Sequence, residues 1–175
     1  AETQAHPRWM QVFLYRDRDF TEELVRRAEV ADYDAIVLTI DNQLLGKRER
    51  DLANGFTIPP KFSPSQYVAM LSKYKWFWRM RGELSRITFG NYVRPGKKED
   101  IKQLAARMAY LLDPGLTWDD VDWIRGMTKK PLIIKGILSP DEADAAIHHG
   151  ADGLVVSNHG GRQLDGALSS LEALP

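Results

Sequence analysis

The stretch GADGLVVSNHGGRQLD, residues 150–165, decides the fold that we expect for this chain. Within it, Gly153–Ser157 has the length and the branched apolar residues of a buried strand, and the pattern of Asp141–His149 just before it is helical. Polar residues and glycines follow the strand at once, so it ends in a loop that carries a histidine and an arginine. Helix, buried strand and polar loop in this order are typical of an α/β protein.

Three similar apolar runs precede this strand, with helical patterns between them: Trp9–Tyr15, Ala35–Ile40 and Pro131–Lys135. Near-continuous apolar strands that alternate with helices indicate a parallel sheet covered by helices. We expect one helix to begin at a Thr21 cap, a second over Trp118–Met127, and a third over Asp141–His149 after Ser139-Pro140.

The polar residues at the ends of these runs favour a (β/α)8 barrel over a doubly wound sheet. Barrel enzymes collect their functional residues at the C-terminal ends of the strands, and here those positions hold Gln11 and Phe13, Thr39 and Asp41, Lys135, then Ser157 and His159. A complete barrel needs about 250 residues, so this chain is expected to supply only part of one, with a long insertion over residues 42–117.

Composition excludes several kinds of site and partner. The chain has no cysteine, which rules out disulfides, zinc-thiolate sites and thiol nucleophiles, and we expect no metal site. Its 24 basic and 24 acidic residues balance, so no overall field favours nucleic acid. No apolar stretch approaches the roughly 20 residues of a spanning helix, and the N-terminus has no signal pattern, so a cytoplasmic location is expected.

Four residues carry the candidate chemistry. His159 is a candidate base, and Arg162 presents a fixed fork for a carboxylate, a pair that suits a hydroxy acid. Asp41 either orients the imidazole or is an ordinary cap or turn residue. Lys135 is expected on the inward face of the barrel, where it either stabilises an anionic cofactor or forms a Schiff base, as in barrel aldolases; the alternative is a lysine that reaches solvent.

Five stretches resemble, in order and over nearly the whole chain, the FMN-dependent 2-hydroxy acid dehydrogenase family. They are RWMQVFLYRDR (8–18), AIVLTID (35–41), GKRERD (46–51), PLIIKGIL (131–138) and GADGLVVSNHGGRQLD (150–165). The resemblance implies a TIM barrel of the (β/α)8 type, FMN as cofactor, and oxidation of an L-2-hydroxy acid such as lactate or mandelate to the 2-keto acid. It also implies a homo-oligomer, a tetramer in the family.

The resemblance implies roles for individual residues. His159 would be the base, Asp41 would support the protonated imidazole, and Lys135 would stabilise the reduced flavin. Arg162 and Arg48 would hold the substrate carboxylate. The other polar residues near the strand ends would bind the flavin ring: Gln11, Thr39 and Ser157.

Two departures from the family pattern stand out. Phe13 replaces the usual tyrosine, so the hydroxyl that faces the substrate is missing, and Tyr15, one pleat further on the same face, is not an obvious substitute. The chain is also expected to hold only strands 3 to 6 of the barrel, with the long loop after strand 4. We therefore expect that the 175-residue chain alone is not an active flavoenzyme. The remaining alternative to an enzyme is a non-catalytic barrel fragment.

Residues 61–86 combine aromatic and basic side chains. Tyr67, Leu71, Tyr74 and Trp78 have the spacing of one helix face. Among the charged residues at positions 73–86, Glu83 is the one acid, and the bases are Lys73, Lys75, Arg79, Arg81 and Arg86. This combination predicts a membrane interface, while an active-site lid packed on its own barrel or on a neighbouring subunit explains it equally well. Membrane-associated lactate and mandelate dehydrogenases of the family carry such a segment, which implies quinone or another acceptor and a peripheral position on the inner face of the cell membrane.

Overall fold

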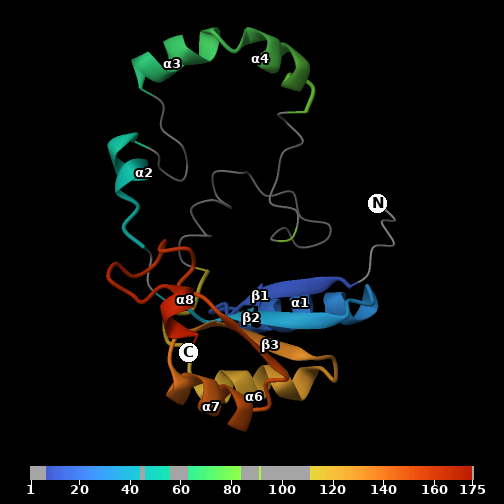
Figure 1. The fold of residues 1–175 in the computed structure, drawn as a ribbon. Coiled ribbons are helices and arrows are strands. Elements are labelled where there is room, and N and C mark those ends of the chain that lie inside the picture. The colour runs from blue at the N-terminus through green and yellow to red at the C-terminus, as the bar shows by residue number, and fades with distance from the viewer. Residues whose placement is uncertain (1–6, 44–45, 56–62, 84–90, 92–110, 175) are drawn as a thin grey trace. The chain divides into compact units, whose positions relative to one another are not determined.

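The computed structural model describes residues 7–43, 46–55, 63–83, 91 and 111–174. The chain divides into two compact units, residues 1–47 with 111–175 and residues 48–110. The described part of the first unit holds a parallel sheet with its helices, and that of the second holds three short helices (Figure 1).

Four parallel strands form the sheet and lie in the order in which they occur in the chain: β1 (Trp9–Phe13), β2 (Ala35–Thr39), β3 (Leu132–Ile137) and β4 (Gly153–Val156). A doubly wound sheet reverses its strand order at a switch point, whereas a (β/α)8 barrel adds each strand beside the previous one. The described sheet shows no reversal. Its arrangement is that of part of a (β/α)8 barrel, as predicted.

The helices that connect the strands pack beside one another in sequence order. α1 (Arg18–Val30) contacts β1 and α6 (Trp118–Met127), α6 contacts α7 (Pro140–His148), and α7 contacts β3 and β4 (Figure 1). α8 (Ser170–Ala173) is a single turn near the C-terminus. Consecutive strands covered by consecutive helices reproduce one sector of a barrel wall.

The predicted start of the first helix was wrong. α1 begins at Arg18, and its cap is Asp17, whose carboxylate accepts a hydrogen bond from the Phe20 N–H at 3.1 Å. Thr21 lies inside the helix and is fully buried, where its hydroxyl accepts a hydrogen bond from the Tyr15 N–H. An aspartate four residues upstream is as good a cap as a threonine, so the sequence alone did not separate the two.

Capping boxes fix the other two helices at the carboxyl end of the sheet. Thr117 and Asp120 cap α6, and Ser139 and Glu142 cap α7, as the Ser-Pro sequence predicted. The Glu142 carboxylate also accepts hydrogen bonds from the backbone N–H groups of Leu138 and Ser139. The end of β3 is therefore tied directly to the helix that follows it.

The two faces of the sheet differ in burial, except in β2, whose five residues are all buried. The face that packs against the helices carries branched apolar side chains that are no more than 1% exposed: Val12, Ile36, Leu38, Leu132 and Ile134. Alternate residues point to the opposite face, where the register aligns Phe13, Thr39, Lys135 and Val155 in one row. In a barrel this second face is the interior, the position predicted for Lys135.

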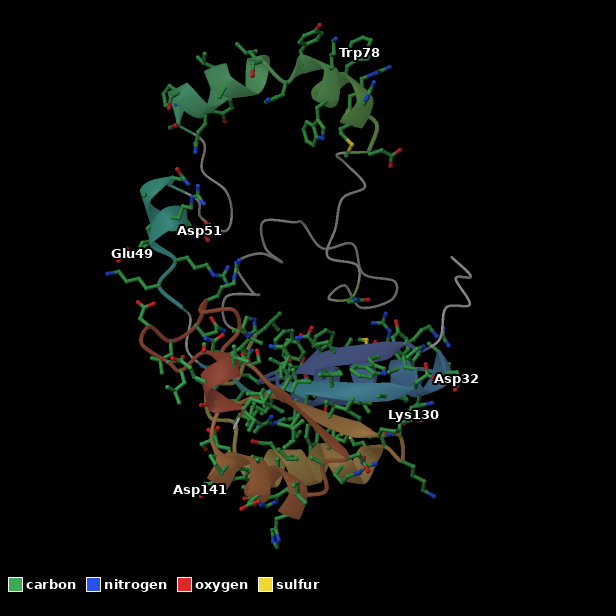
Figure 2. The ribbon with its side chains drawn as sticks, viewed as in Figure 1. Asp32, Glu49, Asp51, Trp78, Lys130 and Asp141 are labelled. Atoms are coloured by element: carbon green, nitrogen blue, oxygen red, sulfur yellow. The ribbon has the colours of Figure 1, made fainter. Side chains whose placement is uncertain are left out.

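Ion pairs join the segments that lead into the strands. Lys130 Nζ lies 3.2 Å from Asp32 Oδ1 (Figure 2), and the Arg125 guanidinium lies 2.8 Å from Asp152 Oδ2. The same Asp152 oxygen accepts a hydrogen bond from the Leu132 N–H at 2.8 Å. The N-terminal end of a barrel contributes stability rather than chemistry, and these pairs fit that division.

In the second unit, the prediction of one continuous helical face over residues 67–78 was wrong. The structure has α2 (Glu49–Ala53), α3 (Pro64–Leu71) and α4 (Tyr74–Met80), and the chain leaves the helix between Leu71 and Tyr74. No helix among the described residues is long and apolar enough to span a membrane.

Candidate active site

The loop after β4 holds His159 at the carboxyl end of the sheet. The Ser157 N–H donates to the Ile137 carbonyl at 3.2 Å, and the Ser157 hydroxyl accepts from the His159 N–H at 3.1 Å. His159, Gly160 and Gly161 follow with φ angles of 59°, 67° and 68°. Glycine adopts this left-handed conformation freely, whereas histidine does so at a cost, so the surrounding hydrogen bonds must hold the His159 backbone in place.

Asn158 supplies further hydrogen bonds to this loop. Its Oδ1 accepts from the Gly161 N–H at 3.1 Å, and its Nδ2 donates to the Leu168 carbonyl at 3.1 Å. Asn158 belongs to the motif, but its role was not predicted from the sequence. An asparagine directly before a run of left-handed residues is the signal of such a side-chain turn and could have been used.

Asp41 joins the histidine to the lysine. His159 Nδ1 lies 2.8 Å from Asp41 Oδ1, and Lys135 Nζ lies 3.7 Å from Asp41 Oδ2. The Asp41 side chain is 11% exposed, against 25% for His159 and 22% for Lys135. Among the described residues, Asp41 Oδ2 accepts no hydrogen bond. The structure thus brings together the three residues that the sequence nominated for catalysis.

Two of the residues nominated for flavin binding contact each other on the inward face. Gln11 Nε2 donates to the Thr39 hydroxyl at 2.8 Å, and Thr39 is fully buried. Ser157, the third, lies in the loop described above, with its hydroxyl oxygen turned to the backbone of His159. Phe13 pairs with Thr39 in the sheet register and lies half-buried.

Tyr15 does not share the inward face, which corrects the expectation from strand periodicity. β1 ends at Phe13, and the Tyr15 ring is only 3% exposed, packed edge-on against Phe20 with ring centroids 5.1 Å apart. Tyr15 therefore cannot supply the hydroxyl that Phe13 lacks.

The two arginines that are predicted to bind the carboxylate belong to different units of the chain. The Arg162 side chain is exposed and makes no hydrogen bond or ion pair within the described part of the chain, while Arg48 precedes α2 in the second unit. The Arg162 backbone lies against Gly46, where an added Cβ would be 1.8 Å from the Arg162 carbonyl oxygen. Only glycine fits at position 46, a requirement that sequence analysis missed.

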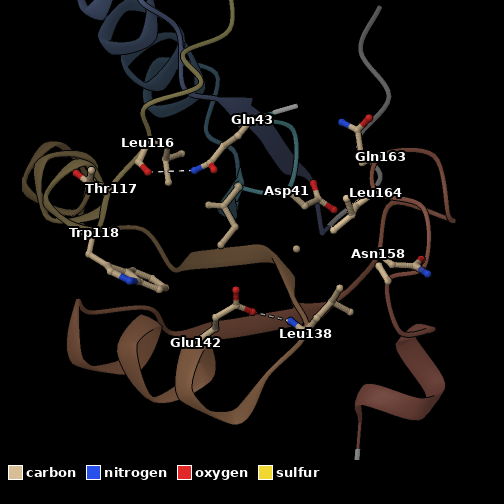
Figure 3. A pocket seen from close by; sticks show the side chains of 13 residues that line it. Asp41, Gln43, Leu116, Thr117, Trp118, Leu138, Glu142, Asn158, Gln163 and Leu164 are labelled. Carbon is tan, nitrogen blue, oxygen red and sulfur yellow. Dashed lines mark hydrogen bonds between the residues drawn. The ribbon is translucent and has the colours of Figure 1, made fainter. Parts of the chain in front are cut away.

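A cavity of about 560 Å³ lies beside Asp41 (Figure 3). Most of its lining is apolar, and it includes Trp118 and Leu138; the Gln43 amide, which donates to the Leu116 carbonyl at 3.0 Å, borders it. Of the residues nominated for catalysis or binding, Asp41 alone lines it in the described structure. His159, Lys135 and Arg162 are absent from this lining, so we do not assign the substrate to this cavity.

Known flavoproteins are similar to this chain along its whole length. The family model of FMN-dependent dehydrogenases matches residues 1–175. An L-lactate dehydrogenase of Caulobacter sp. (strain K31) is 44% identical over 172 residues, which are 97% of this chain and 44% of the relative. A 2-hydroxyacid oxidase of Dictyostelium discoideum is 39% identical over 173 residues, 99% of this chain and 38% of the relative.

A solved structure has the same fold. The monotopic membrane protein (S)-mandelate dehydrogenase superposes with a TM-score of 0.82 at 34% identity, over 94% of this chain and 43% of that one. The chain spans about two fifths of the length of the curated relatives that it matches. Its strand order, its assembled site and these matches agree, and the chain belongs to the family of FMN-dependent dehydrogenases.

Proposed function

We propose that the protein oxidises an L-2-hydroxy acid to the 2-keto acid with FMN as the first electron acceptor. The observation that carries this proposal is the 2.8 Å hydrogen bond between Asp41 and His159, at the end of the sheet where Lys135 also lies. Relatives named for oxidation of lactate, mandelate and other 2-hydroxy acids support it.

The hydrogen bond determines which ring nitrogen of His159 can act as a base. An ionised carboxylate only accepts, so Nδ1 carries the proton that Asp41 binds, and Nε2 keeps its lone pair. Nε2 takes the hydroxyl or the α proton of the substrate, and the imidazolium that forms is stabilised by the Asp41 carboxylate. FMN, when bound, would supply the acceptor for the two electrons that the substrate carbon loses.

The inward face of the sheet fits the flavin ring of FMN. Gln11 is exposed there and is oriented by its hydrogen bond to the fully buried Thr39, and Lys135 lies in the same row as Thr39. Reduction leaves negative charge on the ring, which a lysine ammonium would stabilise. Ser157 is the fourth residue that we assign to the cofactor.

We assign the substrate carboxylate to Arg162 and keep Arg48, which the family resemblance implies, as the alternative contact. The Arg162 guanidinium is exposed and makes no ion pair with described residues, so a ligand meets no competing acid there. Phe13 offers an apolar ring where a hydroxyl is usual in the family, so we place substrate recognition on the arginines and on the shape of the site.

The Schiff-base alternative for Lys135 fits the structure less well. A lysine must be uncharged to attack a carbonyl, whereas Asp41 Oδ2 at 3.7 Å stabilises the ammonium form. Membership of a flavoenzyme family points the same way.

We further propose that α3 and α4 bind an anionic membrane surface, where a quinone takes the electrons. Large apolar side chains of these helices are strongly exposed, among them Leu71 at 74%, Tyr74 at 64% and Trp78 at 69%. Exposed bases accompany them, and the guanidinium carbon of Arg81 lies 4.1 Å from the ring centroid of Trp78. Trp78 is labelled in Figure 2. Interfacial helices combine aromatic rings with cations in this way. The monotopic (S)-mandelate dehydrogenase supports the proposal.

The base is tested by His159→Gln in the full-length protein. Turnover of lactate or mandelate should fall by about two to four orders of magnitude, the usual contribution of a general base, while the flavin absorbance stays that of the unaltered protein. His148→Gln, on the exposed end of α7, is the matched control and should leave turnover unchanged. Near-normal turnover in His159→Gln would remove His159 from this role.

The carboxylate clamp is tested by Arg162→Lys. KM should rise and kcat should fall, with a loss of roughly tenfold or more in kcat/KM, because a point charge replaces a two-pronged donor. Arg26→Lys, on the exposed side of α1, is the control. Steady-state kinetics that match the unaltered protein would move the carboxylate contact to Arg48.

The membrane surface is tested by vesicle flotation. The full-length protein should float with vesicles that contain anionic phospholipid, and added salt should weaken binding. Trp78→Ala should lower the partition coefficient roughly tenfold, since burying a large apolar side chain contributes about 1.5–3 kcal/mol. Leu52→Ala, at a residue that is 62% exposed but lies outside the aromatic and basic segment, should leave the partition coefficient unchanged. Equal loss in both variants, or no flotation of the unaltered protein, would contradict the proposal.

A further inference from the structure

Gly136 is an extra residue in β3. Lys135 pairs with Val155, and Ile137 pairs with Val156, the very next residue of β4, so the strand pairing skips Gly136. This is a β-bulge, a device that changes the direction of a strand and of the side chains beside it. Here it follows directly on Lys135, the residue whose ammonium reaches Asp41.

The bulge brings the backbone of Gly136 into contact with Asp41. A Cβ added at position 136 would lie 2.6 Å from the Asp41 Cβ, 2.8 Å from its Cγ and 2.9 Å from its backbone nitrogen. Real Cβ contacts essentially never fall below 3.0 Å. The φ angle of 114° is also one that residues with side chains rarely adopt. Any substitution would therefore have to displace Asp41 or the bulge.

The position of Asp41 leaves little room for such a displacement. One carboxylate oxygen lies at hydrogen-bonding distance from His159, at 2.8 Å, and the other faces Lys135 at 3.7 Å. Moving the Asp41 side chain by the several tenths of an ångström that a methyl group needs would lengthen or misalign the contact with His159. Hydrogen bonds weaken steeply with such changes, and the orientation of the base depends on this one.

We infer that Gly136 is a positioning residue: the bulge glycine of β3 leaves the space in which the Asp41 carboxylate is held between Lys135 and His159. The effect of Gly136 on turnover rests on the proposed function, because Gly136 acts through the base of that reaction. The contact between Gly136 and Asp41 does not rest on the proposed function, so the contact and the effect on turnover can be tested separately.

The contact is tested by thermal unfolding of the full-length protein in two backgrounds. Gly136→Ala should lower Tm clearly, and less so when Asp41→Gly removes two of the three atoms that the new methyl group meets. Gly150→Ala is the control for backbone strain: its φ is 80°, but its nearest neighbours are flexible Arg125 side-chain atoms at 3.1 Å and beyond. It should lower Tm equally in both backgrounds.

The consequence is tested by kinetics once the unaltered protein has been shown to oxidise a 2-hydroxy acid. Gly136→Ala should lower kcat by about 100-fold, the cost of a misplaced catalytic group, with KM nearly unchanged because Arg162 is untouched. In an Asp41→Asn background, Gly136→Ala should lower kcat by less than about threefold, since the contact between residue 41 and His159 is already impaired.

Each outcome bears on the inference. An equal loss of Tm from Gly136→Ala in both backgrounds, or an equal loss of kcat, would overturn it. If Gly136→Ala alone yields no folded protein, recovery of folded protein in the Asp41→Gly background supports the inference, and failure to recover it overturns it. An unaltered protein without 2-hydroxy acid turnover would defeat the proposed function, and the unfolding comparison would still decide the role of Gly136.

Discussion

The carboxylate of Asp41 is the group on which the candidate site depends. It follows β2, it contacts a histidine that follows β4, and it faces the lysine of the strand between them. A carboxylate that is only 11% exposed is costly to bury unless charged and hydrogen-bonding partners surround it. His159 and Lys135 therefore stabilise the Asp41 carboxylate, and Asp41 in turn positions both side chains. These contacts hold the ends of β2, β3 and β4 together.

The asymmetry of the sheet supports this arrangement. Branched side chains on one face pack against the helices and are almost completely buried, which makes the strands a rigid base. The opposite face carries the polar residues, so it can take a cofactor without disturbing the packing beneath it. Capping of α7 by Ser139 and Glu142 extends that rigidity to the loop after β3. Precise positions at a site require a support of this kind.

Much of the fold followed from local patterns, and the site followed in part. Strand runs, the helix start at Ser139-Pro140 and polar strand ends are short-range signals, so the barrel sector and the meeting of Asp41 with His159 could be predicted. Close approaches between distant segments leave no such signal: nothing in the sequence says that Gly46 lies on Arg162 or that Gly136 lies on Asp41. The predicted helix boundaries were wrong where two residues can both serve as the cap, as with Asp17 and Thr21. They were also wrong where an apolar spacing continues across a break in the helix, as before Tyr74.

Anaerobic flavin reduction in Asp41→Asn tests the central claim most directly. The asparagine keeps the shape of the side chain but neither stabilises the imidazolium nor requires the proton on Nδ1. Mixed with an L-2-hydroxy acid in a stopped-flow instrument, the full-length variant should bleach its flavin at least about tenfold more slowly than the unaltered protein, with its FMN content unchanged. Bleaching at the unaltered rate would show that the carboxylate between His159 and Lys135 does not support the base, and would contradict the account.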